Sequence, residues 1–196
     1  MLTMPAPMLF HGVMRRLFIL LFFFWGAPAM AQPQALSIPA HPAEQAANGP
    51  AVLDAMLWQP AGRGPHPAII LLHGCAGMRN RAGQPFPRDT DWAQRLSRLG
   101  YLVLQVDSLT PRGESSLCGQ GNDRRIRVSV ERARDAYAAL LFLQARSDVK
   151  PDRIALMGWS NGGGTVLWTL GRDNRARPAG LRHDFAAAVA FYPGCR

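Results

Sequence analysis

Short apolar runs alternate with longer amphipathic stretches along most of the chain. The uninterrupted run from Ala68 to Leu72 is typical of a strand that is covered on both faces. Further apolar segments predict strands at residues 52–58, 101–106, 153–157 and 185–192. Apolar positions three and four residues apart predict helices at residues 91–99, 123–146 and 163–170. Strands alternating with helices predict an α/β fold with a doubly wound, mostly parallel sheet.

The first 31 residues have a different character. They contain no acidic side chain, carry Arg15 and Arg16, continue through an apolar run at residues 17–25, and end in Ala29-Met30-Ala31. This pattern predicts a secretory signal peptide that is cleaved before Gln32. The nine apolar residues fall short of the roughly 20 that a membrane-spanning helix needs, so we expect no stable membrane insertion after cleavage.

Domain organisation follows from this reading. Residues 1–31 form the predicted signal peptide, with Met14 as an alternative start to Met1. Residues 32–50 are rich in proline and alanine and are expected to form a flexible leader, and residues 51–196 one domain. Export predicts a periplasmic or secreted protein.

Composition and charge narrow the choice of partners. The chain has 196 residues, of which 48% are hydrophobic and 18% charged, as in ordinary globular proteins. Without the predicted signal peptide, 20 basic and 13 acidic side chains leave a net charge of +7. The best basic cluster, residues 124–127, opens a predicted amphipathic helix and indicates a solvated helix face. We therefore expect no nucleic-acid partner.

The carboxyl ends of three predicted strands carry distinctive residues, and in an open parallel sheet functional groups collect at such ends. The third of these ends reads GWSNGGG and contains Ser160. A strand that turns abruptly into a helix needs glycine on both sides of the exposed residue, and Gly158 and Gly162 satisfy this need. Two interpretations are open: Ser160 is a catalytic nucleophile, or it is a small residue in a flexible turn. The strand-to-helix context favours the nucleophile.

The other two strand ends suggest supporting roles. The amide of Asn161 would lie at a helix N-terminus, where it could stabilise a developing oxyanion. The loop after the strand at residues 68–72 would supply the second donor, for which the Cys75 amide is the best candidate. We expect His73, Gly74, Asp107 and Trp159 to line the site. For His73, bracing of the loop by hydrogen bonds is favoured over a role as base, and for Asp107 a loop-capping role is equally open.

With these motifs, the chain resembles the α/β-hydrolase superfamily and, within it, the dienelactone hydrolase family. The resemblance extends from about residue 52 to the end of the sequence. It rests on LHGCAG at residues 72–77, DS at 107–108 with PRG at 111–113, the elbow at 158–163 and FYPGC at 191–195. It implies an exported serine hydrolase that cleaves small carboxylic esters or lactones through an acyl-Ser160 intermediate. One departure is the nucleophile, because the founding dienelactone hydrolases use cysteine.

A larger departure concerns the other triad members. In this superfamily an acid and a histidine follow the serine on later loops, but Asp173, His183 and Asp184 all precede the last predicted strand. We find no triad acid or histidine, so we expect a fold that is incomplete at its C-terminal end and impaired in activity. Without a base, a serine hydroxyl is a poor nucleophile at neutral pH.

The sequence contains three cysteines, which in an exported chain suggests one disulfide and one odd thiol. Cys75 and Cys118 belong to loops at the active-site end and are the candidate pair. Cys195 then pairs with a residue outside this sequence or is a free thiol. A Cys118–Cys195 bridge would contradict this assignment.

Two other classes of function are alternatives to a serine hydrolase. A non-catalytic hydrolase remnant or a small-ligand-binding protein is the main alternative to the enzyme. Nucleotide binding by residues 162–164 is disfavoured because neither the GxGxxG spacing nor a terminal Gly-Lys-Ser/Thr is present. The residues indicate no cofactor and no metal site, and they leave the substrate and the oligomeric state open.

Overall fold

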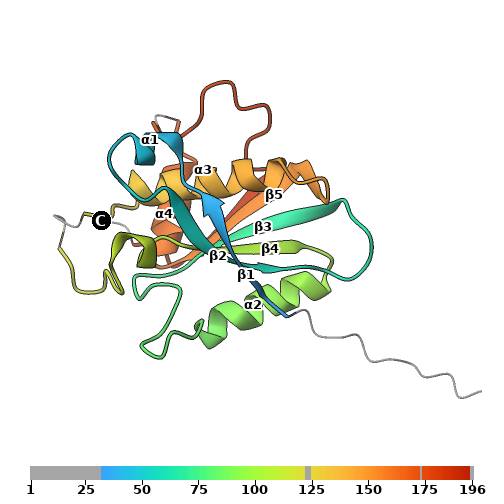
Figure 1. The fold of residues 1–196 in the computed structure, drawn as a ribbon, viewed down its shortest axis with the longest axis horizontal. Coiled ribbons are helices and arrows are strands. Elements are labelled where there is room, and N and C mark those ends of the chain that lie inside the picture. The colour runs from blue at the N-terminus through green and yellow to red at the C-terminus, as the bar shows by residue number, and fades with distance from the viewer. Residues whose placement is uncertain (1–31, 122–124, 173, 195–196) are drawn as a thin grey trace, which may run out of the picture.

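The computed structural model describes residues 32–121, 125–172 and 174–194 (Figure 1). Within these ranges, one sheet has the strand order β1-β2-β4-β3-β5-β6. The strands are β1 Gln34–Pro39, β2 Val52–Trp58, β3 His66–Leu72, β4 Leu102–Asp107, β5 Val149–Trp159 and β6 Ala187–Phe191. Strands β4, β3, β5 and β6 run parallel, whereas β1 and β2 are antiparallel to their neighbours. The prediction of a mostly parallel α/β sheet is confirmed.

Helices cover both faces of the sheet. The helical elements are α1 Pro42–Gln45, α2 Pro87–Arg98, η1 Thr110–Arg112, α3 Glu131–Gln144 and α4 Asn161–Thr169. Figure 1 shows α2 on one face and α3 with α4 on the other. None of the helices in the described ranges is long and apolar enough to cross a membrane.

The apolar run of β3 shows why the central strand is buried on both sides. Successive side chains of a strand point to opposite faces. Ile70 and Leu72 accordingly join the hydrophobic cluster that includes the buried face of α3, whereas Ile69 and Leu71 join the cluster that includes α2. The same residues that predicted this strand thus build both cores and fix the carboxyl edge where the site lies.

Residues 32–50 differ from the expected flexible leader. Gln34–Pro39 pairs antiparallel with β2 over its full length, and α1 follows directly. The segment is held by few side chains: Ile38 is fully buried in the main core, and Glu44 pairs with Arg112 at 2.8 Å. The proline- and alanine-rich composition did not predict this edge strand. The strand is stabilised by its pairing with β2, which local composition does not reveal.

The long helix predicted at residues 123–146 is shorter in the structure. Helix α3 begins at Glu131, and its carboxylate accepts a hydrogen bond from the Arg127 amide at 2.7 Å. Residues 125–130 form turns, and Ile126 packs with Leu109 and Leu117 in a small separate cluster. The apolar spacing in this segment therefore reflects burial under a loop, which periodicity does not distinguish from a helix face.

Candidate active site

Ser160 lies at an abrupt turn between β5 and α4. Its backbone has φ 52° and ψ −114°, a conformation that residues with a side chain rarely adopt. The turn is anchored at both ends, because the Ser160 amide donates to the Phe191 carbonyl at 3.0 Å and the Gly164 amide donates to the Ser160 carbonyl at 2.9 Å. A strained serine held in this way is a feature of functional sites, and it disfavours the flexible turn.

The glycines around Ser160 are required by close backbone approaches. A Cβ atom on Gly158 would lie 2.4 Å from the Gly162 carbonyl oxygen, and one on Gly162 would lie 2.2 Å from the Leu72 carbonyl oxygen. Neither contact is possible without moving backbone. The turn therefore brings the start of α4 directly against the end of β3, and the need for glycine on both sides of Ser160 agrees with the sequence motif.

Two backbone amides are available beside Ser160. Asn161 is the first residue of α4, and the Gly74–Cys75 loop approaches from β3, with a Cβ position on Gly74 only 3.9 Å from the Ser160 Cβ. Cys75, Ser160 and Asn161 line the same cavity of about 470 Å³. Neither the Cys75 nor the Asn161 amide donates a hydrogen bond to another described residue. Both are thus free to donate to a ligand oxygen, and their role as oxyanion donors stays a prediction.

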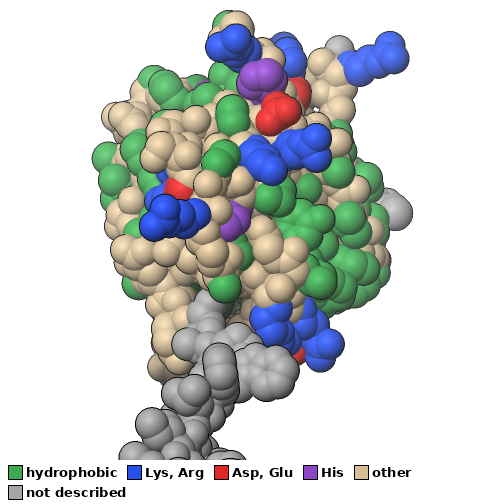
Figure 2. All heavy atoms as spheres, turned by 90° about the vertical axis from the view of Figure 1, so that its right-hand side faces the viewer, with side chains coloured by type: hydrophobic (Ala, Val, Ile, Leu, Met, Phe, Trp, Pro, Cys, Tyr) green, Lys and Arg blue, Asp and Glu red, His purple; other side chains and the backbone are tan. Residues whose placement is uncertain are grey.

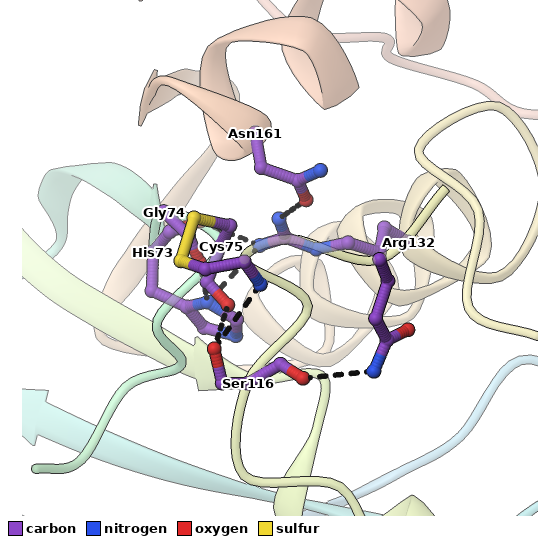
Figure 3. The surroundings of a disulfide bond; sticks show 8 residues. His73, Gly74, Cys75, Ser116, Arg132 and Asn161 are labelled. Atoms are coloured by element: carbon purple, nitrogen blue, oxygen red, sulfur yellow. Dashed lines mark hydrogen bonds between the residues drawn. A yellow bond between two sulfur atoms is a disulfide. The ribbon is translucent and has the colours of Figure 1, made fainter. Parts of the chain in front are cut away.

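The Cys75 side of this cavity is held by a disulfide. Cys75 and Cys118 are bonded, as predicted, with their Cα atoms 5.0 Å apart (Figure 3). The Leu117 amide also donates to the Cys75 carbonyl oxygen at 2.7 Å. The Ser116 hydroxyl donates to the same oxygen at 3.4 Å, so the loop that carries the candidate oxyanion amide is fixed by a covalent bond and by hydrogen bonds. Cys195 lies outside the described residues.

His73 lies beneath the site and does not line it, contrary to expectation. Its side chain is fully buried. Nε2 accepts from the Ser108 amide at 3.2 Å, which places the ring proton on Nδ1, where it donates to the Gly74 carbonyl at 2.7 Å. Burial, with the nearby Arg132 charge, lowers the pKa of His73 to about 3. Both ring nitrogens are occupied, so this neutral histidine braces the loop and cannot act as the base.

Asp107 and Trp159 are also buried, which corrects their predicted place in the site lining. Asp107 Oδ1 accepts from the Leu109 and Thr110 amides at 3.0 Å, and Oδ2 accepts from the Thr110 hydroxyl at 2.7 Å. Its carboxylate thus caps the loop after β4. The Trp159 ring stacks on Phe191 with centroids 5.9 Å apart. Of the expected lining residues, Gly74 does line a cavity next to Ser160.

Ser160 has no base among the residues that the structure describes. Its hydroxyl has no hydrogen-bond partner there, and no histidine or carboxylate lines either cavity that it reaches. His66 begins β3 and His183 precedes β6, which places both at the opposite edge of the parallel sheet. His41 caps α1, and Asp184 pairs with an arginine at 2.7 Å. Asp173 lies outside the described residues.

Two cavities meet at Ser160, and they differ in character. The larger one, of about 470 Å³, has Gln120, Arg127 and Trp168 in its wall. The second, of about 320 Å³, is walled by Phe86, Pro87 and Arg88 together with the Gly74–Gly77 loop. A bound carbonyl next to Ser160 would therefore have space on two sides, one more polar and one more apolar.

Sequence reasoning missed two arginines near the serine. Arg127 was assigned to a solvated helix face, but it lines the larger cavity and pairs with Glu131 at 2.7 Å. Arg132 is fully buried, although the predicted helix at residues 123–146 implied no role for it. A signal existed, because Arg132, Ala136 and Leu140 are four residues apart and share the buried side of α3. A charge within an apolar stripe indicates a specific partner.

Metal-binding groups and surface charge are two further features of the described residues. In the described ranges, no group of three or more histidine, cysteine or acidic residues could hold a metal ion. On the face shown in Figure 2, Lys and Arg side chains form separate small groups between apolar and neutral ones. Charge is thus dispersed on this face, as expected for solvated helices and loops.

The sequence of this chain is similar to those of known hydrolases and peptidases. The prolyl oligopeptidase family model matches residues 88–192. The chain is 29% identical over 128 residues to YtaP of Bacillus subtilis, which is named as a candidate hydrolase, and covers 42% of it. It is 31% identical over 121 residues to the quorum-quenching protein AidA of Acinetobacter baumannii and covers 36% of it. These matches cover 58% and 62% of this chain.

The solved structures agree on the fold. A Klebsiella pneumoniae protein described as a candidate dienelactone hydrolase superposes with a TM-score of 0.55 at 16% identity, over 83% of this chain and 60% of that one. At this identity the match supports the α/β-hydrolase fold. It does not separately show membership of the dienelactone hydrolase family. The chain spans less than two thirds of each of these relatives. Because the family model covers more than half of its residues, the chain belongs to the prolyl oligopeptidase family and has the α/β-hydrolase fold.

Proposed function

We propose that this chain carries the nucleophile and the oxyanion donors of a serine hydrolase that forms an acyl-Ser160 intermediate. The main support is the strained backbone of Ser160, φ 52°, at the start of a helix, beside two amides that have no partner in the described part of the chain. In this scheme the Ser160 oxygen attacks the carbonyl carbon while its proton passes to a base. The carbonyl oxygen becomes an oxyanion that the Cys75 and Asn161 amides stabilise. The leaving group takes the proton, and water then releases the acid.

The base and its acid would come from residues outside the described part of the chain. The four described histidines are buried, cap a helix or lie at the far edge of the sheet. Without a base, acylation relies on the oxyanion donors and on substrate binding, which together support only about 10³–10⁴-fold acceleration over water. With the described residues alone we expect slow acylation and an acyl group that persists on the serine.

Small carboxylic esters or lactones are the proposed substrates. The two cavities at Ser160, of about 470 and 320 Å³, are of a size that suits small ligands. Apolar walls from Phe86 and Pro87 favour a short acyl or alkyl group. Activated esters place the least demand on a missing general acid, because their leaving groups depart without protonation.

A direct test is to incubate the purified full chain with p-nitrophenyl butyrate and, separately, with a fluorophosphonate. We expect intact-mass and peptide analysis to locate one acyl or phosphonyl adduct on Ser160, with slow release of the acyl group. Ser160→Ala is the matched control and should carry neither adduct. Equal labelling of Ser160→Ala, or no adduct in the wild type, would favour a non-catalytic or ligand-binding protein. Fast turnover, as in ordinary esterases, would show that a base is present.

A second candidate is cleavage of peptide bonds, which the family match to the prolyl oligopeptidases favours. An amide has a poor leaving group that must be protonated, so it depends more strongly on a general acid than an ester does. Offering a dipeptidyl p-nitroanilide alongside the ester separates the two. Serine-dependent release of nitroaniline at a rate comparable to ester cleavage would favour the peptidase.

We also propose that the protein is exported to the periplasm or secreted. The N-terminal sequence has the pattern of a signal peptide, and a disulfide between Cys75 and Cys118 suits an oxidising compartment. Expressed in a Gram-negative bacterium, the mature protein should begin at Gln32. Recovery of a cytoplasmic protein that retains residues 1–31 would contradict export.

A further inference from the structure

Arg132 is a buried cation that bonds no carboxylate of the described residues. It is the second residue of α3, its side chain is fully buried, and its Nε has no partner among the described residues. The adjacent carboxylate of Asp135 is occupied, since Arg112 binds both of its oxygens at 2.8 and 2.9 Å. Burying a charge in this way costs several kcal/mol per ion. Its position therefore calls for a specific explanation.

The guanidinium of Arg132 instead bonds the two segments that carry the candidate oxyanion donors. Nη2 donates to the His73 carbonyl at 2.8 Å, two residues before Cys75. Nη1 donates to the side-chain oxygen of Asn161. Figure 3 shows the guanidinium lying between the Asn161 side chain and the His73–Cys75 segment. One planar group thus joins the end of β3 to the start of α4.

The same group brings a positive charge beneath the site. Burial lowers the pKa of Arg132 to about 10, partly offset by the nearby Asp135 and Asp107 carboxylates, so the side chain remains protonated at neutral pH. In a water-poor environment such a charge stabilises a nearby anion more strongly than it would in solvent. His73 also lies against this guanidinium. Because its ring is neutral, it adds no second positive charge and does not neutralise that of Arg132.

We propose that Arg132 is a positioning residue that sets the spacing between the Cys75 and Asn161 amides and adds positive charge beneath the oxyanion. This inference rests on the proposed function, because it concerns the oxyanion site of the acylation step. It predicts that loss of the guanidinium lowers the maximal rate of Ser160 modification and has little effect on reagent binding. Misplacement of a catalytic group by about 1 Å can cost about 10²-fold in rate.

The test compares Arg132→Met, which keeps the length of the side chain, with Arg132→Lys, which keeps the charge. Arg134→Met is the matched control, because Arg134 lies on the same helix but pairs with Glu44 at 3.1 Å, away from Ser160. The rate of Ser160 phosphonylation is measured against reagent concentration. We expect Arg132→Met to lower the maximal rate by about 10²-fold at unchanged half-saturation, Arg132→Lys to recover part of that loss, and Arg134→Met to match the wild type.

Amide hydrogen exchange of Leu117 and Gly164, which bond the Cys75 and Ser160 carbonyls at 2.7 and 2.9 Å, provides a second readout that does not depend on reactivity. We expect faster exchange at both amides in Arg132→Met and wild-type exchange in Arg134→Met. If Arg132→Met does not fold, Arg132→Lys carries the comparison. Wild-type reactivity or unchanged exchange in a folded Arg132 variant would overturn the inference. If the wild type itself is not labelled, the proposed function fails, while the exchange measurement still decides the positioning role.

Discussion

Gly162→Ala is expected to destabilise the protein severely, whereas Gly164→Ala, two residues along the same turn of α4, is expected to be harmless. An added Cβ on Gly162 would lie 2.2 Å from the Leu72 carbonyl oxygen and 2.6 Å from that of His73. Both contacts are with backbone of the central strand, so no side chain can move aside. We expect a loss of at least about 3 kcal/mol in the free energy of unfolding, as for severe overpacking, against a typical total of about 5–15 kcal/mol.

Gly164 serves as the control because its added Cβ would meet nothing closer than 3.8 Å. Alanine is favoured over glycine inside a helix by up to about 1 kcal/mol, so Gly164→Ala should be neutral or stabilising. Gly163 lies between the two, with its nearest backbone oxygen at 2.8 Å from the added atom. Urea unfolding of the three variants should give this graded order. Equal stability of Gly162→Ala and Gly164→Ala would mean that β3 and α4 are not packed as closely as described.

The elbow illustrates what the sequence can predict. Its requirements are local: an apolar strand, a serine and two glycines within five positions specify a turn whose close backbone contacts leave no room for side chains at the two glycines. The apolar run of β3 is equally informative. A strand that is buried on both faces requires apolar residues at successive positions, so the uninterrupted run predicts this burial. These features place Ser160, Asn161 and the Gly74–Cys75 loop together without any knowledge of side-chain contacts.

The features that the sequence did not predict depend on distant contacts. Strand β1 has one fully buried apolar side chain and is defined by its pairing with β2. The buried His73 is in contact with Arg132, which is 59 positions further along the chain. A histidine at the end of a strand has the same local pattern whether it faces a cavity or lies under a loop. Only the packing of α3 decides between these two positions.

Removal of the Cys75–Cys118 disulfide is expected to destabilise the protein and to slow modification of Ser160. The bridge closes a loop with a sequence separation of 43 residues. The loop-entropy model gives about 4 kcal/mol for a loop of this length. Cys118 is exposed, so reductants can reach the bridge. We therefore expect both Cys118→Ser and treatment of the wild type with dithiothreitol to lower the free energy of unfolding by up to this amount.

The effect on reactivity follows from the position of Cys75. Its amide is the candidate oxyanion donor from the β3 side, and without the bridge the loop is held by hydrogen bonds alone, among them those of the Leu117 amide and the Ser116 hydroxyl to the Cys75 carbonyl. We expect Ser160 phosphonylation to slow by at least about tenfold, but by less than the 10²–10³-fold that follows outright loss of an oxyanion donor. Cys195→Ser is the control, because it also removes one thiol but leaves the bridge intact.

If Cys195→Ser reproduces the loss, or if peptide mapping links Cys118 to Cys195, the pairing is wrong. If Cys118→Ser loses stability but keeps the wild-type rate, the loop does not need the bridge to present its amide.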